Sequence, residues 1–122
     1  MTGDSRVGVP GAPTGVDPER VLAAADQALA MVSGPLPRYR DVLALSDELR
    51  EFLRSMVAHT APRITELRSA SRRTDATGTV TEARYRLSLT SGEGLQSAAD
   101  QARALALILR ELCSLYTAEF LE

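Results

Sequence analysis

The chain contains one histidine and one cysteine, the two side chains most often used for nucleophilic or metal chemistry near neutral pH. A carboxylate-bridged metal site in a helical bundle needs Glu-x-x-His pairs on facing helices, and the residue three before His59 is Met56. A serine hydrolase would place His59 beside an exposed nucleophile, and its segment has no nucleophile elbow. We therefore expect His59 to be a partly exposed helical residue without chemistry of its own.

Cys113 follows Leu112 near the C-terminal end of an apolar segment. A thiol becomes reactive where a helix N-terminus or a nearby cation lowers its pKa, and neither is expected there. We predict a buried, unreactive thiol. A single cysteine also excludes a disulfide within the chain and favours the reducing cytoplasm as its location.

The segment Ser91-Gly92-Glu93-Gly94 has the glycine spacing of some anion-binding loops, whose backbone N–H groups point outward. Glu93 would repel a phosphate, no lysine follows and no strand precedes. We predict a flexible turn between two helices. No residue set thus indicates a catalytic site, a metal site or a cofactor, and we expect the protein not to be an enzyme.

Arginines are concentrated in one part of the chain. All fourteen basic residues are arginine, and six of them lie between residues 63 and 86 with only three carboxylates, giving that segment a charge of +3 and the remainder −5. We predict a basic patch where the second and third helices meet, able to contact an acidic protein or a phosphate. The alternative is a solvated surface, with Glu82 and Arg86 forming an ordinary i,i+4 pair. The candidate contact residues are Arg68, Arg72, Arg73, Arg84 and Arg86.

Composition limits the kind of partner. The formal charge of −2 provides no overall attraction to nucleic acid, and no recognition helix or aromatic platform is evident. The richest apolar stretch, Ala104 to Leu109, is far shorter than the ~20 residues that cross a bilayer. At 122 residues the chain has the size of one domain. We predict a disordered tail over residues 1–16, which lack an apolar period, and a single helical domain over residues 17–122.

The first two helices follow from their capping residues and apolar spacing. Asp17, Pro18 and Glu19 favour a helix start, and Gly34-Pro35 a stop, which predicts a helix from Pro18 to Val32. A second apolar stripe begins near residues 37–40 and keeps its phase across Pro62. We predict one helix, kinked at Pro62 and continuing to about Arg72, in preference to two separate helices.

The third helix is predicted to be the shortest. Residues 73–78 are polar and read as a loop, and Thr79 to Glu82 has the form of a capping box, in which a threonine hydroxyl and a glutamate satisfy exposed backbone donors. A short helix would follow and end at the turn of residues 91–94.

The fourth helix is predicted to run from Leu95 to Glu122 and to be the central element. Its apolar arc spans roughly 200°, too wide for the seam of a two-helix coiled coil. Leu107 falls on the polar side of this helix and is a candidate for an association patch. The 3,4 stripe consists of Leu95, Ala98, Ala102, Leu105, Leu109, Leu112, Tyr116 and Glu119.

Two stretches resemble a known family. Residues 80–87 have the form V-x-E-A-R-x-R-L, and residues 102–116 have the form A-R-x-L-A-x-x-L-x-x-L-C-x-x-Y. Their order and spacing resemble a family of short, helical actinomycete (Streptomyces-type) proteins classed only as a domain of unknown function. The resemblance covers about Arg40 to Tyr116, and residues 71–79 depart from it. It implies no activity, and no site residue can be transferred.

We therefore expect an all-α, up-down four-helix bundle with a disordered N-terminal tail. We expect a small cytoplasmic, non-catalytic regulatory protein that acts through contacts with another protein or with itself. The alternative is a sensor that holds a nucleotide-like anion at the arginine-rich end of the bundle.

Overall fold

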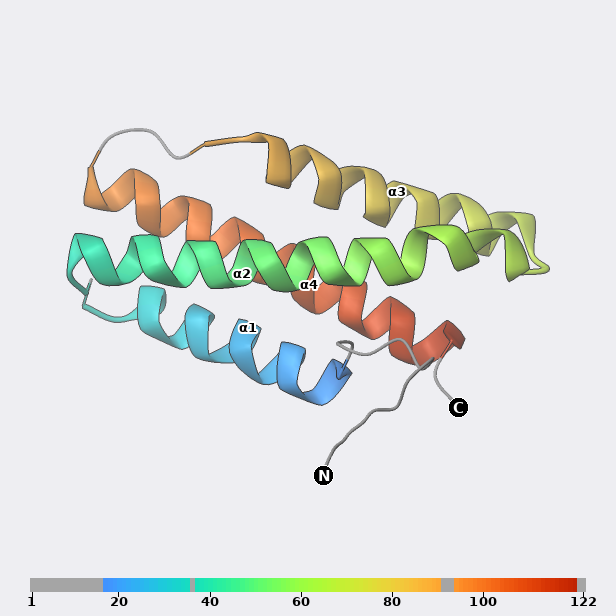
Figure 1. Cartoon of the computed structure of the whole chain (residues 1–122), viewed down its shortest axis with the longest axis horizontal. Coiled ribbons are helices and arrows are strands. Elements are labelled where there is room, and N and C mark those ends of the chain that lie inside the picture. The colour runs from blue at the N-terminus through green and yellow to red at the C-terminus, as the bar shows by residue number, and fades with distance from the viewer. Residues whose placement is uncertain (1–16, 36, 91–93, 121–122) are drawn as a thin grey trace, which may run out of the picture.

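The computed structural model describes residues 17–35, 37–90 and 94–120. Within these residues the secondary structure is helical, with four α-helices and one 3₁₀ helix. Successive α-helices run in opposite directions, as Figure 1 shows, and this confirms the predicted up-down four-helix bundle. The predicted disordered tail, residues 1–16, lies outside the described residues.

Helix α1, Pro18–Ser33, begins and ends where its sequence predicts, to within one residue. The Asp17 carboxylate accepts hydrogen bonds from the backbone N–H groups of Glu19 (3.2 Å) and Arg20 (3.4 Å), which caps the helix. Its buried side chains, Val21, Ala25, Ala28 and Val32, recur at spacings of four and three. These side chains form the face of α1 that packs against the rest of the bundle.

Helix α2, Tyr39–Thr60, is followed directly by the 3₁₀ helix η1, Ala61–Glu66. Pro62 lies in the first turn of η1, so the helical path continues through the proline with a change from α to 3₁₀ geometry. The predicted continuation to Arg72 is wrong, because the chain becomes extended at Leu67 (ψ 132°). Leu67 is buried in that extended conformation, so its place in the apolar stripe did not require a helix.

Helix α3, Ala70–Ser88, replaces the predicted loop and short third helix. The Ser69 hydroxyl accepts a hydrogen bond from the Arg72 backbone N–H (3.3 Å) and caps the helix there. Thr79 therefore lies inside the helix, where its hydroxyl donates to the Asp75 carbonyl (3.2 Å), and it does not form the predicted capping box. At 19 residues α3 is longer than the 16 residues of α1, so it is not the shortest of the four.

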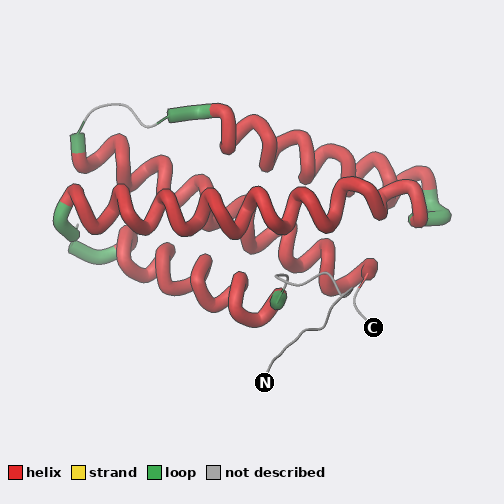
Figure 2. The backbone as a smooth tube through the Cα atoms, in the orientation of Figure 1, coloured by secondary structure: helices red, strands yellow, loops and turns green. Residues whose placement is uncertain are grey.

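Helix α4, Leu95–Phe120, is the predicted central helix. It packs against α1, α2 and α3, and in Figure 2 it runs behind α2 between the other two. Its apolar face is wide, as expected, because residues on both sides of the stripe are also buried. The fully buried large side chains of α4 are Leu105, Leu109 and Leu112. None of the described helices has the length and apolarity needed to span a bilayer.

Candidate functional site

The outward side of α4 lies between α1 and α3 and contains one exposed large apolar side chain. Leu107 is 50% exposed, whereas Leu105 and Leu109, two residues away on either side, are fully buried. The neighbouring positions on this side are the exposed polar residues Asp100 and Arg103. The predicted exposure of Leu107 is thus confirmed, and its surroundings decide what it can contact.

Leu107 lies in a groove between α3 and α4. The groove has a volume of about 360 Å³ and opens to solvent. Its lining residues are Glu82, Arg86, Asp100, Arg103, Ala104, Leu107, Ile108 and Glu111. A second hollow shares Glu82 and Glu111 with it and continues along α3 past Thr79, Gly78 and Asp75. We call these two adjoining hollows together, from Asp75 and Glu111 at one end to Arg86 and Asp100 at the other, the α3–α4 groove.

Internal contacts hold both arginines of the α3–α4 groove. Arg86 Nε lies 2.8 Å from a Glu82 carboxylate oxygen, the i,i+4 pair that the sequence offered as the alternative to a basic patch. Arg103 donates to the Val32 carbonyl at the C-terminal end of α1 (3.0 Å). Among the described residues, Asp75, Asp100 and Glu111 form no ion pair. The groove therefore presents carboxylates around an apolar centre.

Tyr85 precedes the groove residue Arg86 on α3 and was not predicted as a site residue. Its side chain is 55% exposed, and the Arg86 guanidinium carbon lies 5.8 Å from the centre of its ring. Tyr85 is therefore next to a groove residue, but it does not line the groove itself.

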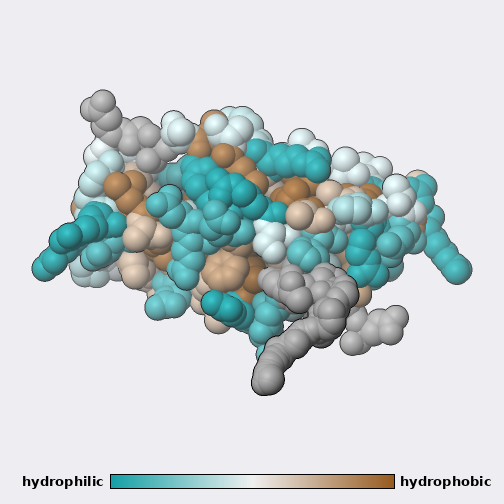
Figure 3. All heavy atoms as spheres, in the orientation of Figure 1, coloured by the Kyte–Doolittle hydropathy of each residue, from teal (hydrophilic) through white to brown (hydrophobic). Residues whose placement is uncertain are grey.

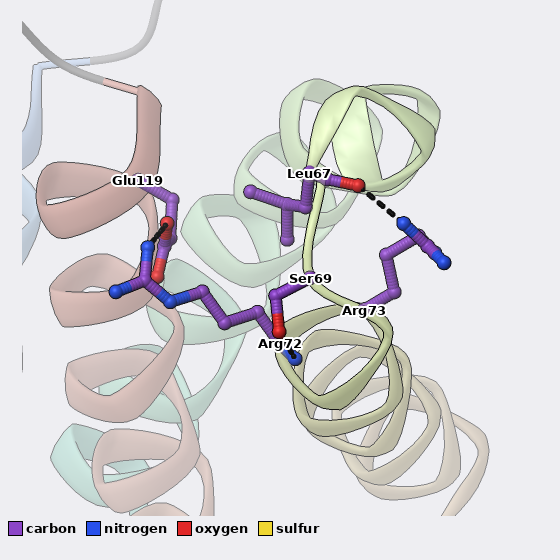
Figure 4. A network of polar contacts seen from close by, with 5 residues as sticks. All are labelled: Leu67, Ser69, Arg72, Arg73 and Glu119. Atoms are coloured by element: carbon purple, nitrogen blue, oxygen red, sulfur yellow. Dashed lines mark hydrogen bonds and ion pairs between the residues drawn. The ribbon is translucent and has the colours of Figure 1, made fainter.

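The structure does not bring the five candidate arginines together. Arg72 Nη1 lies 3.4 Å from a Glu119 carboxylate oxygen on α4, whereas Arg73 donates to the carbonyl oxygens of Leu67 (2.6 Å) and Arg68 (3.0 Å). Figure 4 shows the two guanidinium groups extending to opposite sides of α3. Arg68, which precedes the start of α3, is exposed.

The other two candidates, Arg84 and Arg86, are separated from this group by a run of helix. Twelve residue steps separate Arg72 from Arg84, about 18 Å at 1.5 Å per residue. Because residues 73–78 are helical, they hold the two groups of arginines apart, and the single basic patch expected from the sequence does not form. Arg84 is exposed, and Arg86 lines the α3–α4 groove.

His59 and Cys113 both have structural surroundings, as expected. His59 is partly exposed on α2, and its Nδ1 lies 2.8 Å from the Ser55 carbonyl oxygen. Cys113 is buried, and its Sγ donates to the Pro18 carbonyl (3.1 Å). Burial raises the pKa of the Cys113 thiol, and the Asp17 carboxylate adds to this rise against an opposing hydrogen bond with Thr117. Across the described parts of the chain, no three potential ligands among His, Cys, Asp and Glu are grouped as a metal site.

Away from the groove, apolar surface is scattered. On the face seen in Figure 3, brown hydrophobic residues form small separate areas among teal hydrophilic ones. A hollow between α1 and α2 is lined by Met31, Leu45 and acidic residues, and the exposed Tyr39 lies at the start of α2. The groove is lined by Leu107, one of the three exposed large apolar side chains of the described residues, and is the strongest candidate site.

Comparison with known proteins extends the resemblance noted in the sequence. The sequence model of a protein family, described as a family of unknown function (DUF6415), matches residues 19–119. This match covers both motifs and also includes α1, which lay outside the predicted resemblance. No curated protein and no solved structure matches the chain.

Proposed function

The chain belongs to DUF6415, a family of unknown function, and we propose that it is a small non-catalytic protein that works by binding another protein. The observation that carries the proposal is the exposure of Leu107 within the α3–α4 groove. An exposed apolar side chain surrounded by charged residues in a hollow has the arrangement of a protein interface, in which an apolar centre lies within a polar rim.

The chemistry of the two most reactive side chains favours a binding role over catalysis. Cys113 is buried with a raised pKa, which disfavours the thiolate needed for nucleophilic attack. His59 Nδ1 lies 2.8 Å from the Ser55 carbonyl oxygen, and among the described residues it belongs to no group of potential metal ligands. We infer that such a protein has a regulatory role and acts in the cytoplasm.

The alternative, a sensor of a nucleotide-like anion, has less support. Its arginines lie in two groups along α3, and Arg72, Arg73 and Arg86 hold partners within the chain. Thermal-shift measurements with nucleotides test it directly, because a ligand that binds only the folded state raises Tm. A saturable rise in Tm that is lost in Arg84→Gln would favour the sensor over the protein-binding role.

Replacing Leu107 tests the proposed function. We expect Leu107→Gln to keep the fold and to reduce recovery of the protein partner by about tenfold or more in co-purification from the native host, because it removes the apolar anchor. Tyr39→Gln is the matched control, since it removes another exposed apolar side chain that does not line the groove. Quantitative mass spectrometry of the co-purified proteins gives the measurement. Equal recovery by both variants and the wild type would contradict the proposal.

A further inference from the structure

A glycine lies in the middle of α3, on the wall of the α3–α4 groove. Gly78 is part of the helix and lines the groove with Asp75, Thr79 and Glu82. Glycine is among the poorest residues for a helix interior, because it loses more backbone freedom than alanine on folding. A Cβ added to Gly78 would meet no atom within 4 Å. The packing of this chain therefore gives no reason for a glycine here.

A glycine at position 78 is explained if the backbone of another molecule lies in the groove. A wall without a Cβ allows a second helix to lie closer than side chains otherwise permit. The groove extends along α3 from Asp75 to Arg86, eleven residue steps or about 16 Å. This length matches about three turns of an added helix.

The charge of the groove identifies the kind of helix that fits. Four carboxylates and two arginines line it, which leaves a formal charge of −2. Arg86 is paired with Glu82, and Arg103 is held by the Val32 carbonyl, so Asp75, Asp100 and Glu111 are without an ion-pair partner among the described residues. Basic side chains at the edges of an occupying helix would complement these carboxylates.

We infer that the α3–α4 groove binds a basic amphipathic helix of a different protein. The inference rests on the proposed function and specifies the partner's chemistry. The bound helix places a small residue against Gly78, an apolar residue against Leu107, and lysine or arginine side chains toward Asp75 and Glu111. This mode of recognition is the insertion of an amphipathic helix into a groove.

Photo-crosslinking in the native host identifies the segment that occupies the groove. A photoreactive amino acid replaces Ala104, a groove residue, and in the control it replaces Ala23, which is exposed on α1. Mass spectrometry then sequences the cross-linked segment. We expect a segment of another protein with helical apolar spacing, a net positive charge and a Gly, Ala or Ser among its apolar positions.

Failure of the inference and failure of the proposed function give different results. A neutral, acidic or non-helical segment, or a second copy of this chain, at position 104 would overturn the inference and leave a protein-binding role in place. No cross-link beyond that of the Ala23 control would overturn both.

Gly78→Ala adds a test in which stability and binding move in opposite directions. Because the added methyl group has room and alanine favours helix, we expect Tm of the free protein to rise by about 4 °C. Binding of a synthetic peptide with the sequence of the cross-linked segment should weaken by about tenfold, because the methyl group occupies the space of the partner backbone. Thr77→Ala, on a part of α3 that lines a different hollow, is the matched control and should raise Tm without weakening binding. Undiminished binding by a folded Gly78→Ala would overturn the inference.

Discussion

The surroundings of Cys113 explain why the one thiol of the chain is structural. It lies on α4 near the start of α1, where it is 2% exposed and donates to the Pro18 carbonyl. A neutral thiol can make this hydrogen bond, whereas a thiolate cannot. Burial therefore raises the thiol pKa by favouring the protonated form, and the Asp17 carboxylate acts in the same direction.

This raised pKa predicts a loss of stability in alkaline solution. The unfolded chain releases the thiol proton near its ordinary pKa of about 8.5, but the folded chain keeps it to a higher pH. The unfolded state thus binds fewer protons over this interval, and the free energy of unfolding falls as pH rises. We expect urea denaturation between about pH 8 and 10 to show a steeper fall for the wild type than for Cys113→Ala. Parallel curves for the two proteins would contradict this assignment.

Among the helices, α3 is held by the fewest buried side chains. Its interior positions are Ala76, Val80 and Ala83, all small, and its first half contains threonines, Asp75 and Gly78, which are weak helix formers. Side-chain hydrogen bonds hold both ends of α3. Ser69, directly before the helix, caps its start, and the Arg50 guanidinium of α2 donates to the carbonyls of Leu87 (2.9 Å) and Leu89 at its end. These features make α3 the element that opens most easily.

Replacing Arg50 tests whether α3 opens more easily than the other helices. We expect Arg50→Met to lower the free energy of unfolding by about 1–2 kcal/mol, because the Leu87 carbonyl loses the Arg50 donor and the Leu89 carbonyl keeps only its hydrogen bond from Gln101 Nε2 (3.3 Å). Amide hydrogen exchange should accelerate mainly in α3. Arg54→Met is the control, since Arg54 is exposed and pairs only with Glu51 on its own helix, and it should change the stability by less than about 1 kcal/mol. Exchange that accelerates equally in all helices would show that α3 does not open independently.

The sequence predicted all four α-helices and placed the start of the third one too late. Asp17 and Pro18 define the start of α1, and the long stripe defines α4. At the junction of η1 and α3, the apolar spacing of Leu67 and Ala70 suggested a continuous helix, but periodicity does not distinguish a buried extended residue from a buried helical one. The cap at Ser69 competed with a better-formed capping box at Thr79. Ala76, which is fully buried ahead of Thr79, favours the start at Ser69.

In the whole molecule α4 is the helix on which the others assemble. It packs against α1, α2 and α3, and α1 meets α2 far less extensively than either meets α4. The α3–α4 groove also depends on α4, because it forms where α3 packs against α4. The sequence identified Leu107, but Gly78 could not be assigned to a helix face while residues 73–78 were taken as a loop.

Substitutions on either side of α4 should separate folding from binding. We expect Leu109→Ala, at a fully buried position, to lower the free energy of unfolding by about 2–5 kcal/mol through loss of apolar burial and formation of a cavity. Leu107→Ala, at the half-exposed position, should cost less than about 1 kcal/mol. Chemical denaturation followed by circular dichroism measures both. A similar loss in the two variants would show that Leu107 contributes to the core of the bundle.

The central place of α4 affects how the protein folds during synthesis. Helix α4 is the last of the four to leave the ribosome, because it lies C-terminal to the others. Until then α1 and α2 have little surface to cover their apolar faces, since their principal neighbour has not been translated. Stalled chains that end before Leu95 should therefore remain protease-sensitive and dependent on chaperones, and the bundle should become protected only after α4 has emerged.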